Sequence, residues 1–386
     1  MTESDGIVVT AAAEGFLSRP ALPALDLELT ERCDNDCRHC CANLPLDDAE
    51  ARGREMSTER VKEIIDEAVD LGLLRLRITG GEPLVRDDFE EVYLHARRRG
   101  VAVGLCTNAR RVTRRLADLF ARVPPLSPAE VTVYGMTAQT YETMTCRRGS
   151  FDEFRRGLGL LVEAGVPLRL NGAFRPPFEA EMRALVEWAE SLPTVTDTPV
   201  WVAFYDLRRR RDSERRNETI EKLRAVPDEV LAAGAAVAGH EAVSPDFCRR
   251  FCGPTGDRVF SCDIGGRPAV DPYGYVHGCS QLRDPSAAYD LSAGSLKQAL
   301  TDHFPRLAAT RASDPAYLER CARCFLAGIC DQCPARSYAE YGVFDRPVEY
   351  QCEVTRAKAR RLGLLAPGEH PWEVTDWKER IECLTE

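Results

Sequence analysis

The chain has 386 residues, 44% of them hydrophobic and 29% charged, which is typical of a soluble globular protein with one large domain or two ordinary ones. Its formal net charge of −10 excludes a general nucleic-acid binder, because no excess of Lys and Arg is available to neutralise phosphates. The sequence contains no apolar run of about 18 residues, so it predicts no membrane span. No signal peptide is evident either, and we therefore expect a cytoplasmic protein that needs no membrane.

The first part of the chain alternates between strand-like and helix-like patterns. We expect strands at 24–29, 73–79, 101–106, 131–135, 167–174 and 199–205, and helices at 57–71, 87–99, 110–121, 138–165 and 178–191. Ser57 is the expected N-cap of the first of these helices. Six strands that alternate with helices predict the α/β class, with a parallel sheet closed into a partial (β/α)6 barrel. In such folds the chemistry gathers at the carboxyl ends of the strands.

The character of the sequence changes after a helical stretch near 217–238. From about residue 246 the expected elements are short, and ten of the sixteen cysteines lie there among many Gly and Pro residues. Short elements without a sizeable core need staples, such as bound metal. We therefore expect an N-terminal extension at 1–23, the barrel at 24–245, a small metal-organised domain at 246–360 and a C-terminal tail at 361–386.

Three of the cysteines follow the first expected strand directly. Cys33, Cys37 and Cys40 have the spacing CxxxCxxC, and in a reducing compartment such thiols are metal ligands or redox groups rather than disulfides. A [4Fe–4S] cluster normally takes four cysteine ligands, so three would leave one iron open to a substrate or cofactor. A zinc site is the alternative for this loop.

A second motif follows the second expected strand. It consists of Gly80, Gly81, Glu82 and Pro83, and adjacent glycines let the backbone approach a ligand closely. CxxxCxxC and GGEP at successive strand ends resemble the radical S-adenosylmethionine (SAM) superfamily. The resemblance implies that SAM chelates the open iron, that GGEP holds the SAM amine, and that reductive cleavage gives a 5′-deoxyadenosyl radical. This radical would then abstract a hydrogen atom from a substrate C–H bond.

Residues at the later strand ends complete the expected site. Asn108 follows the third strand, Tyr134 ends the fourth and Arg175 follows the fifth, where the family often places contacts to SAM. Turn and capping roles are the alternatives for these three. Two isolated thiols are candidate hydrogen-atom donors. Cys106 alternates in step with Asn108, and Cys146 lies in the connection after the fourth strand, although a structural role is the commoner fate of a free cysteine.

The C-terminal cysteines carry a second resemblance. Cys262 is followed by eleven residues, Gly274, four residues and Cys279, and later by Cys-x2-Cys-x5-Cys-x2-Cys and a distant cysteine. This is similar to the SPASM extension of radical SAM enzymes, with x2 where the family has x3 before Cys333. It implies an iron–sulfur domain with two auxiliary [4Fe–4S] clusters, and a zinc knuckle is the alternative. The first cluster would be bound by Cys262, Cys279, Cys333 and either Cys252 or Cys248, and the second by Cys321, Cys324, Cys330 and Cys352.

The two resemblances together imply an enzyme that modifies a ribosomally made peptide by cross-linking, epimerisation or dehydrogenation. Only about two dozen residues precede the first strand, so a separate protein is expected to present the peptide. An electron donor of the flavodoxin or ferredoxin type is also implied. Ser280 replaces the Asp of sulfatase-maturating relatives, which argues against that oxidation. The alternatives are a small natural-product substrate, such as a sugar or aminocyclitol, and a non-catalytic iron–sulfur or zinc protein.

Overall fold

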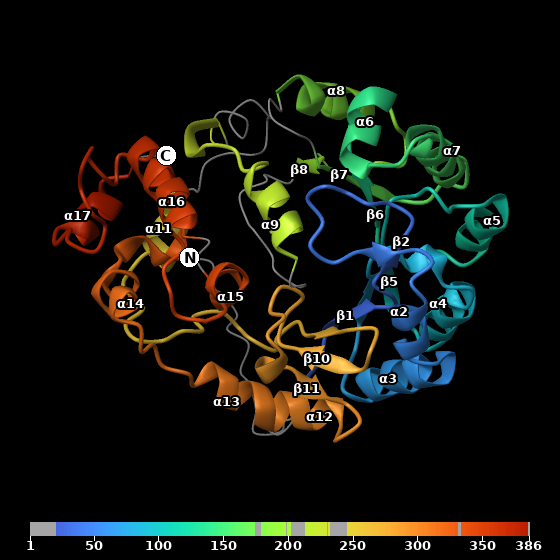
Figure 1. The fold of residues 1–386 in the computed structure, drawn as a ribbon, viewed down its shortest axis with the longest axis horizontal. Helices are drawn as coiled ribbons and strands as arrows, with labels where there is room; N and C mark the ends of the chain where they lie inside the picture. Colours follow the sequence, from blue (N-terminus) through green and yellow to red (C-terminus); the bar gives the residue numbers. More distant parts are fainter. Residues whose placement is uncertain are drawn as a thin grey trace, which may run out of the picture.

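The computed structural model describes residues 21–173, 179–197, 199–201, 213–229, 231, 245–330 and 333–384. Viewed down the shortest axis, the elements form a ring (Figure 1). The strands and helices up to residue 190 make one half of the ring, the C-terminal elements make the other, and α9 (Glu214–Glu221) lies between them. In the part of the chain that the structure describes, no helix has the length and apolar character needed to span a membrane.

Six parallel strands make up most of one sheet, and each pairs with the next in chain order. They are β1 (Ala24–Glu28), β4 (Arg75–Thr79), β5 (Ala102–Thr107), β6 (Ala129–Val133), β7 (Leu168–Gly172) and β8 (Val200–Trp201). The expected α/β fold with a parallel sheet and a Cys-rich C-terminal region is confirmed. The expected strand at 199–205 is described only as far as Trp201. Of the expected helix at 217–238, the first residues belong to α9, which ends at Glu221, and many of the later ones lie outside the described residues.

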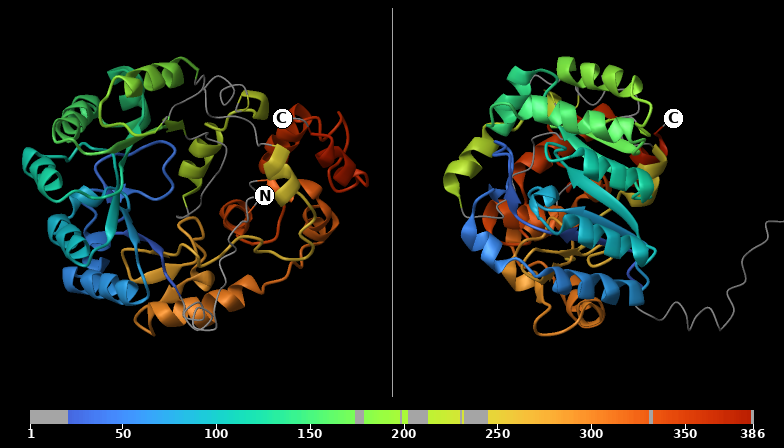
Figure 2. Two further views of the ribbon diagram at one scale, coloured as in Figure 1. Left: turned by 180° about the vertical axis from the view of Figure 1, so that it is seen from behind. Right: turned by 90° about the vertical axis from the view of Figure 1, so that its right-hand side faces the viewer.

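Six helices cover the outer face of these strands (Figures 1 and 2). They are α3 (Thr58–Asp70), α4 (Phe89–Arg98), α5 (Arg114–Arg122), α6 (Ala138–Thr145), α7 (Ser150–Glu163) and α8 (Glu179–Glu190). Ser57 caps α3 as expected, because its hydroxyl accepts the Arg60 N–H at 3.2 Å. The single helix expected at 138–165 is two helices, because Cys146 and Gly149 both adopt left-handed backbone, with φ of 52° and 80°.

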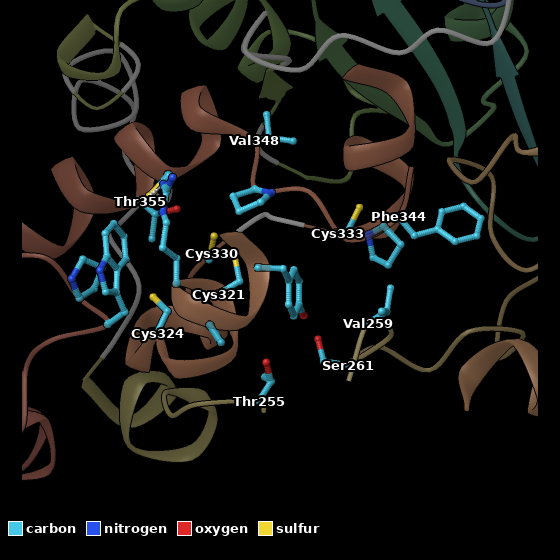
Figure 3. Close-up of a pocket in the computed structure, with 18 of the residues that line it drawn as sticks. Thr255, Val259, Ser261, Cys321, Cys324, Cys330, Cys333, Phe344, Val348 and Thr355 are labelled. Carbon is cyan, nitrogen blue, oxygen red and sulfur yellow. Dashed lines mark hydrogen bonds between the residues drawn. The ribbon is translucent and has the colours of Figure 1, made fainter. Parts of the chain in front are cut away.

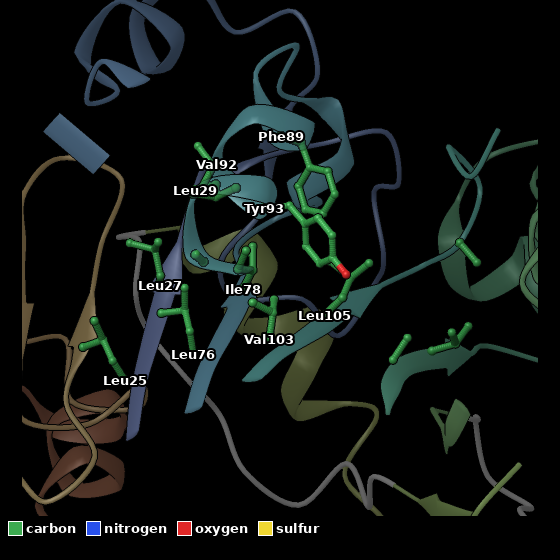
Figure 4. Close-up of a cluster of buried hydrophobic side chains, with 14 of the residues drawn as sticks. Leu25, Leu27, Leu29, Leu76, Ile78, Phe89, Val92, Tyr93, Val103 and Leu105 are labelled. Carbon is green, nitrogen blue, oxygen red and sulfur yellow. The ribbon is translucent and has the colours of Figure 1, made fainter. Parts of the chain in front are cut away.

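The core lies between the sheet and its helices (Figure 4). Leu25 and Leu27 of β1, and Leu76 and Ile78 of β4, are buried and alternate with polar residues that face the other way. Helix α4 packs Tyr93 and its apolar neighbours onto these strands. Each fully buried side chain of this size contributes about 1.5–3 kcal/mol to stability. This packing leaves the concave face of the sheet to polar side chains and fixes the positions of the strand ends.

The C-terminal half is joined to the same sheet. Strand β9 (Ala269–Val270) pairs in parallel with β1, and β10 (Tyr275–His277) and β11 (Tyr289–Asp290) follow in antiparallel register. The α-helices of this half are α11 (Pro245–Phe251), α12 (Leu296–Gln298), α13 (Phe304–Ala308), α14 (Pro315–Glu319), α15 (Pro334–Tyr341), α16 (Glu349–Arg361) and α17 (Trp377–Glu382). Helix α12 and Phe304 of α13 pack in the main core, and two smaller apolar clusters, one around Phe325 and one around Phe260, lie among the other C-terminal elements.

A short two-stranded sheet lies at the carboxyl end of β1. Strand β2 (Arg32–Cys33) pairs in parallel with β3 (Leu44–Pro45), and α2 (Ala49–Arg54) follows. The loop between β2 and β3, which we call the cysteine loop, spans residues 34–43. It therefore lies at the carboxyl end of the sheet, where the sequence places the functional groups.

A glycine on α7 sets how closely that helix packs on the loop after β5. A Cβ atom at Gly157 would lie 1.8 Å from the carbonyl oxygen of Ala109, so we expect Gly157→Ala to lower the free energy of unfolding by about 1–3 kcal/mol. Gly159→Ala is the matched control, because a Cβ atom there meets nothing within 4 Å. The control should be neutral or more stable by up to about 1 kcal/mol, since Ala favours helix. Urea unfolding followed by circular dichroism measures both, and equal stabilities would contradict the packing described.

Candidate active site

The cysteine loop follows directly after one of the expected cluster ligands, Cys33 of β2, and contains the other two. Cys33 and Cys37 are 6% and 4% exposed, while Cys40 is half-buried. The Cys40 N–H donates to the Cys37 carbonyl at 3.0 Å, which folds the loop into a tight turn. Burial raises the pKa of both Cys33 and Cys37 well above that of an ordinary thiol, and the nearby Cys40 raises both further. The three thiols are therefore neighbours in space in a setting that favours a metal-bound thiolate over a free one.

The three cysteines could bind either a single metal ion or an iron–sulfur cluster. Among the described residues, no three His, Cys, Asp or Glu side chains meet as the ligands of a single metal ion would. A [4Fe–4S] cube takes one thiolate at each of several corners, so its ligands surround a volume rather than a point. Cys33 and Cys40 both lie near enough to Cys37 to affect its pKa, and three thiolates on a cube would leave one iron open.

The rest of the protein holds the cysteine loop firmly from two sides. The backbone N–H groups of Asp36 and Arg38 donate to the carbonyls of Thr145 and Met144, at the end of α6. From α9, the Arg216 guanidinium donates to the Cys40 carbonyl at 3.0 Å, and it also pairs with Asp36 at 2.8 Å. Arg216 has no positional signal in the sequence, because it is one arginine in a run of basic residues.

The two glycines of GGEP lie directly against the chain that enters the cysteine loop. A Cβ atom at Gly80 would lie 2.2 Å from the Thr30 carbonyl oxygen, and one at Gly81 would lie 2.4 Å from the carbonyl oxygens of Glu31 and Arg32. Gly80 also has a φ of 144°, a conformation that side chains disfavour. The Gly81 N–H donates to the Thr30 carbonyl at 2.7 Å. Any side chain at either glycine would push this turn away from the cysteine loop.

Glu82 joins the ends of two neighbouring strands. Its carboxylate is fully buried and accepts the Thr107 hydroxyl at 2.9 Å and the Asn108 N–H at 2.7 Å. It also accepts the Leu84 N–H at 3.0 Å, and Pro83 beside it is buried. Burial raises the pKa of Glu82 to about 7. In this structure the carboxylate therefore holds the GGEP turn against the end of β5.

Two of the expected cofactor contacts touch the cysteine loop itself. The Asn108 side-chain amide donates to Asp34 at 2.8 Å and lies 3.9 Å from the Cys33 sulfur. The Tyr134 hydroxyl forms a hydrogen bond with the Cys37 thiol, and its ring centroid lies 5.8 Å from that of His39. Both residues thus lie beside the three thiols. Arg175, the third expected contact, lies outside the described residues.

The two candidate donor thiols occupy different surroundings. Cys106 lies near Arg77 and Glu130, and burial raises the pKa of its thiol to about 12. It belongs to β5, where its neighbours Leu105 and Thr107 are buried. Cys146 is exposed at the end of α6, yet it is near enough to Cys37 to affect the pKa of that thiol. Cys106 therefore faces the concave side of the sheet, and Cys146 lies at the outer edge of the cysteine loop.

The C-terminal cysteines gather in two further places, of which Figure 3 shows one. Cys321, Cys324, Cys330 and Cys352 line one pocket, and Cys333 stands at its edge beside Phe344. Burial, followed by the charges of Cys330 and Cys352, raises the pKa of Cys321 to about 12.

The other group consists of Cys262, Cys279 and Cys333. Partial burial, and next the charges of Cys279 and Cys333, raise the pKa of Cys262. The expected fourth ligand is differently placed. Cys252 contacts Cys248 along α11 and packs with the apolar cluster around Phe325.

A second pocket lies between the GGEP turn and the C-terminal half. It has about 180 Å³ of open space, and its walls include Gly80, Cys41 and Arg77 from the sheet side. Arg283 and Tyr338 line it from the C-terminal side, and Arg283 forms an ion pair with Glu28 of β1. A molecule in this pocket would lie against both the GGEP turn and the concave face of the sheet.

Comparisons with known proteins agree with this geometry. The family model for the radical SAM superfamily matches residues 27–189. The PqqA peptide cyclase of Granulibacter bethesdensis is 25% identical over 238 residues, which cover 58% of this chain and 63% of that enzyme. The AdoMet-dependent heme synthase of Nitratidesulfovibrio vulgaris is 23% identical over 83% of this chain and 89% of its own length. This chain thus spans less than two thirds of the cyclase.

A crystal structure of Streptococcus suis SuiB bound to S-adenosylmethionine has the same fold, with a TM-score of 0.58 and 14% identity over 89% of this chain and 81% of that one. The same protein bound to its precursor peptide SuiA matches with a TM-score of 0.54 and 14% identity, over 85% of this chain and 75% of that one. Both motifs lie within the matched residues, at the strand ends where they meet in space. Residues 27–189 of the chain are therefore a radical SAM domain.

Proposed function

We propose that this protein cleaves SAM reductively and uses the resulting radical to modify a ribosomally made peptide. The observation that carries the proposal is the contact between the Gly80–Gly81 turn and the chain that leads into three clustered thiols. A non-catalytic iron–sulfur carrier or a zinc protein has no need for this contact, because neither leaves an open metal position beside a glycine turn.

Residues of this chain would hold the cofactors as follows. Cys33, Cys37 and Cys40 would bind a [4Fe–4S] cluster, and the GGEP backbone with Asn108 would hold SAM beside it. When bound, the cluster supplies the electron that splits SAM into methionine and a 5′-deoxyadenosyl radical. The buried Glu82 holds the GGEP turn in position through Thr107 and Asn108. The protein would thus orient the cofactor toward the substrate and exclude water from the site.

We assign the substrate to the pocket between the GGEP turn and the C-terminal half. The pocket borders the GGEP turn through Gly80, and its charged walls, Arg77, Arg283 and Glu28, suit a polar peptide segment. The names of two similar proteins support a peptide: one is a PqqA peptide cyclase, and SuiB binds the precursor peptide SuiA. A separate presenting protein and an external electron donor complete the proposed system.

Among peptide modifications, we propose cross-linking first, since the similar cyclase forms a ring in its peptide by name. Epimerisation is the second candidate, because the thiol of Cys106 faces the concave side of the sheet and could return a hydrogen atom to a substrate radical. A small-molecule substrate is the third candidate, because this chain is also similar to a heme synthase over 89% of that enzyme's length.

The C-terminal cysteines would bind two auxiliary clusters. The thiols of Cys321, Cys324, Cys330 and Cys352 line one pocket, which supports one four-cysteine cluster. The proximity of Cys262, Cys279 and Cys333 supports a second cluster. Its proposed fourth ligand is Cys252 or Cys248, and these two cysteines contact each other and pack in the apolar cluster around Phe325.

The first test removes the three loop thiols. We expect Cys33→Ala, Cys37→Ala and Cys40→Ala, combined in one variant, to abolish formation of 5′-deoxyadenosine from SAM and dithionite and to remove about four iron atoms, because one cube is lost. Cys41→Ala, in the same loop, is the matched control and should keep both the iron and the activity. The measurement is deoxyadenosine by chromatography beside an iron assay, and full SAM cleavage by the triple variant would overturn the assignment.

The second test separates cross-linking from epimerisation. Cross-linking needs no hydrogen-atom donor, so Cys106→Ala and Cys146→Ala should both retain product formation within about threefold. The measurement is product mass and deoxyadenosine after reaction in D2O. If Cys106→Ala loses product while deoxyadenosine still forms, the reaction is an epimerisation and Cys106 is its donor. Cys146→Ala serves as the control, because its thiol lies at the outer edge of the cysteine loop.

A further inference from the structure

A basic hollow lies beside the cysteine loop. Its charged lining consists of four arginines and three carboxylates around about 630 Å³ of open space: Arg110, Arg111, Arg147, Arg156, Asp34, Asp47 and Glu153. We call this surface the arginine hollow. The four arginines outnumber the three carboxylates, so the hollow has a small positive excess on a chain whose net charge is −10. Such a local reversal of sign attracts a negatively charged partner.

Two of these four arginines form ion pairs with other described residues, and the other two do not. Arg110 pairs with Glu153 at 2.5 Å, and Arg111 pairs with Asp34 at 3.1 Å. Within the described part of the chain, Arg147 and Arg156 form no ion pair, and both are exposed. Arg148 next to them is exposed as well. The paired arginines therefore fix the shape of the hollow, and the exposed pair presents its positive charge to solvent.

The arginine hollow lies against the outer side of the three loop thiols. Asp34 follows Cys33 in the chain, and its carboxylate pairs with Arg110 at 3.8 Å and with Arg111 at 3.1 Å. Arg147 follows Cys146, whose thiol is near enough to Cys37 to affect its pKa. Since Cys33 and Cys37 are almost fully buried, an electron from another protein must enter through the surface that covers them.

We propose that the arginine hollow is the docking site of an acidic one-electron donor protein of the flavodoxin or ferredoxin type. This rests on the proposed function, because each SAM cleaved consumes one electron, which the docked donor loses as it is oxidised. The balance is one reduced donor and one SAM in, and one oxidised donor, one methionine and one deoxyadenosyl radical out. Redox partners dock through small, transient interfaces, in which charge complementarity sets the rate of encounter.

The test reverses the two exposed charges. The variant combines Arg147→Glu with Arg156→Glu in the full-length, cluster-loaded protein, and deoxyadenosine formation is followed with a bacterial flavodoxin reduced by its NADPH-dependent reductase. We expect the apparent KM for flavodoxin to rise at least about tenfold at low salt and its dependence on salt to weaken. With dithionite, which needs no docking site, the rate should stay within about twofold of the unmodified protein.

A matched control carries the same change of charge at the opposite end of the sheet. Arg75 begins β4 and Arg122 ends α5, so Arg75→Glu with Arg122→Glu reverses two exposed charges far from the cysteine loop. This control should keep the KM for flavodoxin. An unchanged KM in the arginine-hollow variant, or equal effects in both variants, would overturn the docking proposal.

Two further outcomes separate this proposal from the function on which it rests. If the unmodified protein forms no deoxyadenosine even with dithionite, the proposed function fails, and the docking proposal fails with it. If the dithionite rate falls with the flavodoxin rate in the arginine-hollow variant, the change has damaged the site, and the milder pair Arg147→Gln and Arg156→Gln decides. An unchanged KM for flavodoxin in that milder pair overturns the proposal.

Discussion

The contact between the Gly80–Gly81 turn and residues 30–32 is the constraint on which the site depends. It brings the carboxyl end of β4 within backbone hydrogen-bond distance of the chain that enters the cysteine loop. A side chain at either glycine would separate the two strand ends by forcing one backbone away from the other. Glu82 extends the same connection to β5, and Asn108 leads back from β5 to Asp34. Three strand ends and one loop thus form one rigid unit.

Burial gives this unit its chemical character. The cysteine loop is held from outside by α6 and Arg216, and burial raises the pKa of Cys33 and Cys37. A free thiolate is disfavoured in such a place, whereas a metal-bound thiolate is stabilised by the metal charge. The loop is therefore a poor redox thiol site and a good cluster site. In the proposed function, the same burial would require electrons to enter through the surface over the cysteine loop.

The sequence predicted the parts of the fold that repeat, and it missed those that depend on tertiary packing. The alternation of buried Leu25 and Leu27 with Asp26 and Glu28 was sufficient to predict β1, because one face of the strand packs on helices. Strands as short as Ala269–Val270 carry no periodicity, so the continuation of the sheet into the C-terminal half was not foreseen. The left-handed backbone at Cys146 also lacks a signal, since glycine is its usual marker.

Within the site, motifs with fixed spacing were predictable, and contacts from distant segments were not. CxxxCxxC and GGEP are local in sequence, and the structure brings them together. Arg216 comes from α9, and the arginines of the hollow come from the turn after β5, the connection after α6 and helix α7, so only the folded chain brings them beside the cysteine loop.

Iron and acid-labile sulfide content after anaerobic reconstitution, measured beside 5′-deoxyadenosine formation from SAM and dithionite, tests the central claim most directly. We predict about twelve iron atoms per chain with deoxyadenosine formed, as expected of three cubes. If the protein contains zinc in place of iron and forms no deoxyadenosine, the assignment of Cys33, Cys37 and Cys40 to a cluster is wrong, and the proposed function is wrong with it.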